Sequence, residues 1–183
     1  ILNSATCINL HPSLLPCYRG PSPIRTAIMN GDTESGVCLI KMSPELDAGD
    51  ILMCQKFNID INDTNKTVEE KVSKIGTSMI LEYMENPDKY SPKKQSGKIV
   101  YTAKTTVYDE IIDWKKSPIQ IHNLVRALGG GRTKINGIDV KILATKMNGD
   151  KLEIVTIQPA GKKPMDWKSF VNGLRGAEIK FGE

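Results

Sequence analysis

The sequence changes character near its middle, and this change limits the possible architectures of the chain more than any other feature. Residues 86–98, NPDKYSPKKQSGK, are poor in apolar side chains and rich in Pro, Lys and Ser, which is typical of a linker. A chain of 183 residues is long enough for one large domain or two small ones. We therefore predict two domains, residues 1–88 and 99–183, joined by a linker over residues 89–98.

Before the linker, segments whose apolar residues have the spacing of a strand alternate with segments whose apolar residues have the spacing of a helix. Residues 35–42, SGVCLIKM, are rich in small and β-branched side chains and predict a strand. Apolar residues recur at helical spacing after Pro23 and again over residues 63–86, which predicts two helices. Thr67 and Glu70 have the spacing of a capping box for the second of these helices.

Beyond the linker, short alternating segments predominate. Residues 117–131 predict a helix that begins at Pro118 and ends at three glycines. The Asn-Gly pairs at 136 and 148 predict tight turns, the second of them a hairpin turn. Strands are predicted over residues 100–104, 138–146, 151–159 and 177–181. We therefore predict a small β-rich barrel or sandwich with one helix.

Composition excludes several classes of protein. The proportions of hydrophobic residues, 39%, and charged residues, 25%, are typical of a globular rather than a disordered chain. No apolar run is long enough to span a bilayer, so we predict no membrane association. The four cysteines contain no Cys-x-x-Cys pair, and we interpret them as reduced core thiols of a cytoplasmic protein rather than as a disulfide framework: Cys7, Cys17, Cys38 and Cys54.

The net charge of +4 is unevenly distributed along the chain. Up to Gln95 there are ten basic against twelve acidic residues, a net charge of −2, whereas from Ser96 onward there are fifteen against nine, a net charge of +6. This asymmetry indicates either that the second part meets a polyanion or that it has a positively charged, solvated face.

The stretch CINLHPSLLPCYRG carries the chemistry of the first part. In a strand that ends at Pro12, Asn9 and His11 share one face, and together they can donate to an oxygen that acquires negative charge. A carboxylate would keep the imidazole charged and oriented, and Asp47 in the loop SPELDAGD fits this role best. The residues alone also allow His11 to be a structural capping residue and Asp47 a turn residue. No ligand spacing supports a metal site formed with Asp50, so we predict none.

These motifs resemble those of the formyltetrahydrofolate-dependent formyltransferase family. The signature of this family is Asn-x-His, Ser-Leu-Leu-Pro and Leu-Asp-x-Gly. It is similar to the segment INLHPSLLPCYRGPSPIRTAI and to the segments NGDTESGV and ELDAGDIL that follow it. The resemblance implies an α/β, Rossmann-like partial formyltransferase domain with a parallel sheet, and formyl transfer from 10-formyltetrahydrofolate to an amine. It implies that Asn9 binds the formyl oxygen, that His11 stabilises the oxyanion and that Asp47 keeps His11 charged. It assigns folate contacts to Ser13, Leu14, Leu15 and Pro16.

The second part resembles the C-terminal domain of the branch of this family that formylates methionyl-tRNA. The similarity lies in three segments: IDWKKSPIQIHNLVRAL, KINGIDVKIL and LEIVTIQPAGKKPMDWKSFVNG. It implies an OB-like barrel that holds the initiator tRNA through basic side chains, for which we select Arg126, Arg132, Lys134, Lys162 and Lys163; each could equally be a solvated surface charge. We predict that Trp114 and Trp167 pack in the core rather than stack on bases.

Three expectations complete the sequence interpretation. The resemblance covers about the last two thirds of the family's length, so we expect an isolated chain of residues 1–183 to be poorly active. The formyl acceptor is expected to be the amino group of initiator methionyl-tRNA, with a sugar-nucleotide or ribonucleotide amine as one alternative and an inactive fragment that only binds RNA as another. No obligate protein partner is predicted, and the family precedent is a monomer.

Overall fold

The computed structural model describes residues 7–182, which form two compact units. Among these residues, 7–27 and 32–104 form the first unit, and 28–31 and 105–182 form the second. Within residues 7–182, no helix is both long enough and apolar enough to cross a membrane.

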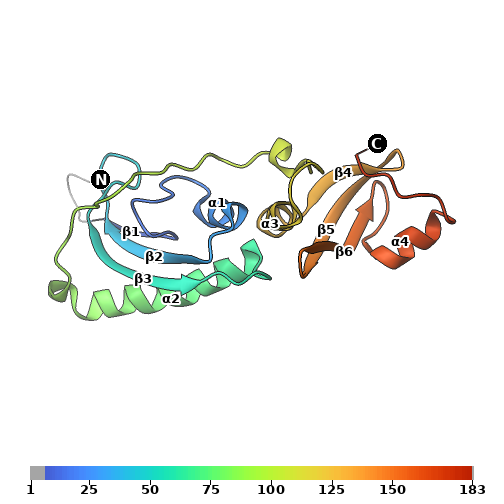
Figure 1. Cartoon of the computed structure of the whole chain (residues 1–183). Helices are drawn as coiled ribbons and strands as arrows, with labels where there is room; N and C mark the ends of the chain where they lie inside the picture. The colour runs from blue at the N-terminus through green and yellow to red at the C-terminus, as the bar shows by residue number, and fades with distance from the viewer. Residues whose placement is uncertain (1–6, 183) are drawn as a thin grey trace. The chain divides into compact units, whose positions relative to one another are not determined.

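The first unit contains a three-stranded sheet in the order β1-β2-β3 (Figure 1). The strands are β1 (Ile8–His11), β2 (Glu34–Lys41) and β3 (Ile51–Asn58). Both pairings are antiparallel, so the prediction of a parallel sheet is wrong for the described strands. The short loop between β2 and β3 has no crossover helix, and such a connection can join neighbouring strands only in antiparallel fashion.

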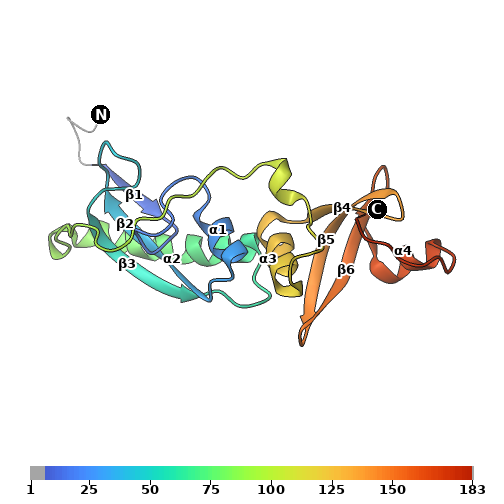
Figure 2. The same ribbon diagram turned by 45° about the horizontal axis from the view of Figure 1, so that its top comes forward.

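Two helices accompany this sheet, as predicted: α1 (Pro23–Asn30) and α2 (Asn65–Glu85). Figures 1 and 2 show α2 running across one face of the sheet. A Cβ atom built on Gly76 of α2 would lie 2.3 Å from Leu10 Cδ2, so the absence of a side chain at Gly76 lets the helix pack closely on β1. Since α2 covers the face to which Leu10 points, Asn9 and His11 lie on the opposite face.

The N-terminus of α2 differs from the prediction. Thr64, rather than Thr67, is the N-cap residue, and its hydroxyl accepts a hydrogen bond from the Thr67 backbone N–H. The Thr67 hydroxyl accepts in return from the Thr64 backbone N–H, at 2.9 Å. A threonine therefore takes the place that a capping box usually gives to Glu or Gln, and the predicted pairing with Glu70 is wrong.

Asp63, just before this cap, makes the stability of the first unit depend on pH. Its burial favours the neutral acid, but hydrogen bonds from Lys71, from the Asp60 backbone and from Thr67 outweigh burial and hold the pKa of Asp63 below its ordinary value of 3.8. A carboxyl with a depressed folded-state pKa stabilises the protein above its unfolded-state pKa, and this stabilisation is lost as the pH falls through the folded-state pKa.

We expect Asp63→Ala to lower the free energy of unfolding by about 1–2 kcal/mol near neutral pH, because it removes hydrogen bonds to a charged group. The difference from the parent should shrink as the pH falls below the ordinary carboxyl range. Urea unfolding followed by circular dichroism at several pH values measures both effects. A difference that stayed constant down to strongly acidic pH would contradict this role of Asp63.

Two of the four cysteines also differ from the prediction. Cys38 of β2 and Cys54 of β3 form a disulfide, with their Cα atoms 4.2 Å apart. The interpretation of all four cysteines as reduced thiols is therefore wrong for this pair. The sequence carries no spacing motif for it; the antiparallel register places the two residues directly opposite each other.

The second unit is β-rich, as predicted, but it contains two α-helices instead of the one predicted. Its four-stranded antiparallel sheet has the order β4-β5-β6-β7, with β4 (Gly131–Ile135), β5 (Ile138–Asn148), β6 (Lys151–Pro159) and β7 (Met165–Asp166). Both Asn-Gly turns are confirmed, since Ile135 pairs with Ile138 and Asn148 with Lys151. Its helices are α3 (Pro118–Leu128) and α4 (Trp167–Gly173).

Segments in both units also differ from the sequence prediction. Instead of the strand predicted over residues 177–181, Phe181 makes only an isolated bridge to Ile135. Residues 100–104 likewise make only a bridge, from Tyr101 to Arg19. The sequence interpretation missed α4 and the short 3-10 helices Pro87–Lys89 and Val107–Glu110.

Buried aliphatic residues from α3 and from the sheet form the core of the second unit, together with Phe170 of α4. Trp114 and Trp167 pack against this core, which confirms the prediction that they are packing residues. The ring centroids of Trp114 and Phe181 lie 4.2 Å apart. The indole N–H of Trp114 donates to the Thr133 hydroxyl at 2.8 Å, so its polar group is satisfied.

Candidate active site and basic groove

The candidate catalytic residues predicted from the sequence lie at and near the end of β1. Asn9 is half-buried and His11 is buried, with 3% of its surface exposed. The loop between β2 and β3 carries Asp47, whose Oδ2 lies 3.6 Å from His11 Nδ1. The carboxylate therefore faces the imidazole, as the sequence interpretation expected, although 36 positions separate the two residues.

The other ring nitrogen of His11 has a fixed partner. His11 Nε2 lies 2.9 Å from the backbone carbonyl oxygen of Tyr18. A carbonyl oxygen can only accept, so Nε2 carries a proton and Nδ1 is the nitrogen that exchanges one. The exchanging nitrogen is thus the one that faces Asp47, and an imidazolium formed there would have a carboxylate beside it.

Both partners of His11 have an unusual backbone. Tyr18 has φ = 62° and Asp47 has φ = 48°, in the left-handed region that residues other than glycine rarely adopt. Two further contacts hold these conformations: the Tyr18 hydroxyl donates to Asp32 at 2.7 Å, and the Gly20 backbone N–H donates to Asp47 Oδ2 at 2.8 Å. Strained backbone maintained by surrounding contacts is characteristic of functional sites.

The sequence interpretation missed Tyr18 and Gly20 as parts of this site. The segment Tyr-Arg-Gly follows the predicted site directly, and its glycine was the available signal. Gly20 has φ = 108°, and a Cβ atom built on it would lie 2.8 Å from the carbonyl oxygen of Thr102. Only glycine fits there, and its backbone N–H is the group that donates to Asp47 Oδ2.

The predicted folate-contacting turn lies directly after His11. Ser13, Leu15 and Pro16 are buried, and Leu14 is half-buried. The Ser13 hydroxyl donates to the Cys17 carbonyl at 2.5 Å, and the Leu15–Pro16 peptide bond is cis. Within residues 7–182, no group of three or more His, Cys, Asp and Glu side chains is arranged to hold a metal ion.

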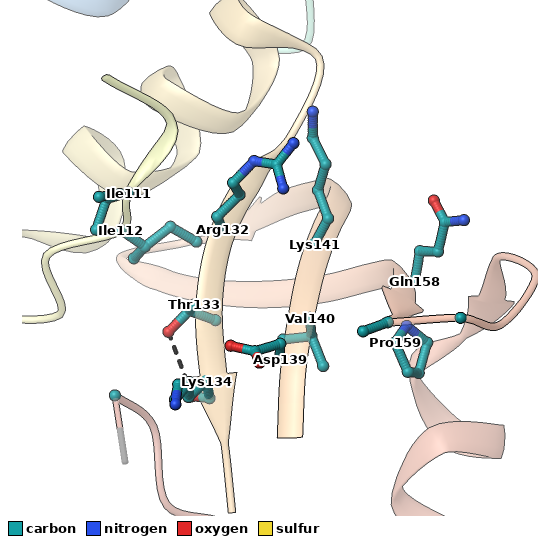
Figure 3. Close-up of a pocket in the computed structure, with 13 residues that line it drawn as sticks. Ile111, Ile112, Arg132, Thr133, Lys134, Asp139, Val140, Lys141, Gln158 and Pro159 are labelled. Atoms are coloured by element: carbon teal, nitrogen blue, oxygen red, sulfur yellow. Dashed lines mark hydrogen bonds between the residues drawn. The ribbon is translucent and has the colours of Figure 1, made fainter. Parts of the chain in front are cut away.

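A groove of about 630 Å³ lies on the second unit (Figure 3). Arg132, Lys134 and Lys141 line it, and the side chains of Arg132 and Lys141 extend side by side from β4 and β5. Glu110 Oε2 lies 2.8 Å from Arg132 Nε and 3.1 Å from Lys141 Nζ. Burial of Glu110 opposes its ionisation, but hydrogen bonds from Lys141 and Arg132 outweigh this effect and hold its pKa below the ordinary value.

The five basic residues selected from the sequence do not lie together. Arg132 and Lys134 are exposed and line the groove, whereas Lys162 and Lys163 are exposed in the loop that follows β6. Arg126 is buried on α3, with 7% of its surface exposed, and its Nε donates to Asn123 at 2.9 Å. Lys141, which the sequence interpretation did not select, belongs to the groove.

Comparison with known families matches both units. Residues 2–84 match the family described as formyl transferase, and residues 104–151 match the formyl transferase C-terminal domain. A methionyl-tRNA formyltransferase of Coprothermobacter proteolyticus is 35% identical, over 96% of this chain and 66% of the relative. One from Streptococcus mutans is 34% identical, over 100% of this chain and 68% of the relative. The chain thus spans about two thirds of the length of these curated relatives.

Two solved structures share the fold. Methionyl-tRNA formyltransferase from Clostridium thermocellum aligns with a TM-score of 0.74 at 22% identity, over 87% of this chain and 70% of that chain. WlaRD, a sugar 3N-formyl transferase solved with dTDP and 5-N-formyl-THF, aligns with a TM-score of 0.64 at 25% identity, over 85% of this chain and 66% of that chain. Relatives with this fold therefore include enzymes with different acceptors.

Proposed function

This chain belongs to the formyl transferase family, and on that premise we propose that it transfers the formyl group of 10-formyltetrahydrofolate to the amino group of initiator methionyl-tRNA. The observation that carries the proposal is the Asp47 carboxylate 3.6 Å from the exchanging nitrogen of a buried histidine. Since charged initiator tRNA is used at the ribosome, we propose a cytoplasmic enzyme, and we propose that it acts as a monomer.

The chemistry that we propose uses the substrate's own amine as nucleophile, so the chain supplies no nucleophilic side chain. As the amine attacks the formyl carbon, the oxygen of the formyl group gains negative charge. The Asn9 amide and the protonated His11 Nδ1 donate to this oxygen. Asp47 stabilises the imidazolium and receives the proton that the attacking amine loses, which can then pass to the leaving nitrogen of the folate.

The folate is assigned to the turn after β1. We propose that Ser13, Leu14, Leu15 and Pro16 form its wall beside His11. Leu14 is the partly exposed side chain among them, whereas Ser13, Leu15 and Pro16 are buried and shape the turn. This arrangement would place the folate next to the proton-exchanging nitrogen.

We infer the identity of the formyl acceptor from the relatives and from the cations of the second unit. The relatives called methionyl-tRNA formyltransferase match the chain over 96% and 100% of its length, and the second unit presents exposed cations on a groove and a loop. Labelled formyltetrahydrofolate should be tested with methionyl initiator tRNA and, in parallel, with an amino-sugar nucleotide. Formyl transfer to the sugar nucleotide alone would overturn the assignment of the acceptor but not that of the chemistry.

The cations of the second unit should contact RNA phosphates. We expect Lys134→Ala, or Lys162→Ala with Lys163→Ala, to weaken tRNA binding and to reduce the slope of log Kd against log salt by about one for each phosphate that the variant no longer binds. Lys151→Ala, at the exposed β5–β6 turn, removes the same charge elsewhere and serves as the control. Equal weakening by the Lys151 variant would show that only net charge matters.

A further inference from the structure

A buried charge near the candidate site has no part in the proposed chemistry. Arg19 follows Tyr18, and only 4% of its surface is exposed. Its guanidinium makes two hydrogen bonds to one oxygen, Gln95 Oε1, from Nε at 3.1 Å and from Nη2 at 2.8 Å. A third bond, from Nη1, reaches Glu45 Oε1 at 3.1 Å. A buried charge is retained only where such contacts satisfy it, so Gln95 is essential to this arrangement.

The other end of Gln95 reaches the loop that carries Asp47. Gln95 Nε2 donates to the carbonyl oxygen of Asp47 at 2.7 Å and to that of Gly49 at 2.8 Å. The oxygen of the amide therefore accepts two hydrogen bonds and its nitrogen donates two, which is the full capacity of a glutamine side chain. Because a guanidinium can only donate, Arg19 dictates which end of the amide faces it, and the two N–H groups must face the loop.

From this geometry we propose that Gln95 is a positioning residue for Asp47, with Arg19 fixing the orientation of its amide. This assignment rests on the proposed role of Asp47 in formyl transfer. Asp47 holds a left-handed backbone, at φ = 48°, which its own conformational preference does not favour. Two hydrogen bonds to the carbonyls at and just after this residue hold the loop so that its carboxylate lies 3.6 Å from His11. The residue responsible lies 48 positions further along the chain, within the segment expected to be a linker.

Substitution by glutamate separates positioning from simple packing. Gln95→Glu keeps the size of the side chain and an oxygen for Arg19, but it has no N–H for the two loop carbonyls and sets a second oxygen against them. We expect Gln95→Glu and Gln95→Ala each to lower kcat about 10- to 100-fold, since a small displacement of a catalytic group costs about that much. The KM values for folate and tRNA should stay within about twofold of the parent. Ser96→Ala, an exposed neighbour, should leave kcat unchanged.

A second measurement does not depend on activity. The chain has two histidines, and His122 lies in the other unit, where its Nδ1 is 2.8 Å from the Thr145 hydroxyl. In Gln95→Ala and Gln95→Glu, the NMR signals of the His11 imidazole should shift because Asp47 moves, whereas those of His122 should stay in place. Circular dichroism equal to that of the parent shows that the first unit is folded as well. Unchanged His11 signals, or normal kcat in Gln95→Glu, would overturn the proposal. If the complete natural protein transferred no formyl group, the proposed function would instead be refuted, and the His11 signals would still decide the role of Gln95.

Discussion

His11→Ala is expected to lower kcat/KM for formyl transfer by about 10²- to 10⁴-fold, the range found when a general acid or an oxyanion donor is removed. Its Nδ1 is the proton-exchanging nitrogen, because the carbonyl oxygen of Tyr18 fixes the proton on Nε2. Asp47→Asn should cause a loss of similar order, since an amide can neither stabilise an imidazolium by its charge nor take up a proton. Steady-state assays with varied tRNA and folate measure both losses.

Asp50→Asn is the matched control for Asp47→Asn. Asp50 lies in the same loop, and its backbone carbonyl accepts from the Lys41 N–H, a bond that a side-chain change leaves intact. We expect this variant to retain kcat within about twofold. If Asp47→Asn lost no more activity than Asp50→Asn, or if His11→Ala kept parental activity, the enzymatic interpretation of the site would be abandoned.

The largest expected effect on stability lies in the second unit. Ile142 of β5 is completely buried in its core, and we expect Ile142→Ala to lower the free energy of unfolding of this unit by about 2–5 kcal/mol. Both tryptophans of the chain pack against this core, so tryptophan fluorescence during urea unfolding reports on this unit.

Ile138→Ala provides the comparison for Ile142→Ala on the same strand. Ile138 has 39% of its surface exposed, and its truncation should cost about 1 kcal/mol or less. Equal losses at the two positions would mean that Ile142 does not belong to a closely packed core. A loss at Ile142 alone supports the packing described above.

The family, the mixed α/β character of the first unit and the β-rich second unit were all predicted from the sequence, and the comparisons bear them out. Local signals were sufficient for Pro23 at the start of α1, Gly129 in the left-handed conformation at the end of α3, and the two Asn-Gly turns. Each depends on residues within a few positions of one another. The roles assigned to Asn9, His11, Asp47 and the basic residues stay predictions.

The errors about the first sheet, the disulfide and Arg126 share one cause, which is that contacts between distant residues leave no local pattern, whereas the N-cap of α2 was misassigned among neighbouring residues. The register that pairs Cys38 with Cys54 and the antiparallel order of the first sheet depend on how strands meet in space. Arg126 looks like its exposed basic neighbours in the sequence, yet its helix places it in the interior.

By itself, the sequence determined the residue types that can perform the chemistry and the turns and caps that delimit many of the elements, because these depend on local stereochemistry and on side-chain functional groups. Only the tertiary structure decided that Asp47 faces His11, that Tyr18 fixes the proton of the imidazole and that Gln95 holds the Asp47 loop. These relations are distances between groups far apart along the chain, and such distances come into existence only when the chain is folded.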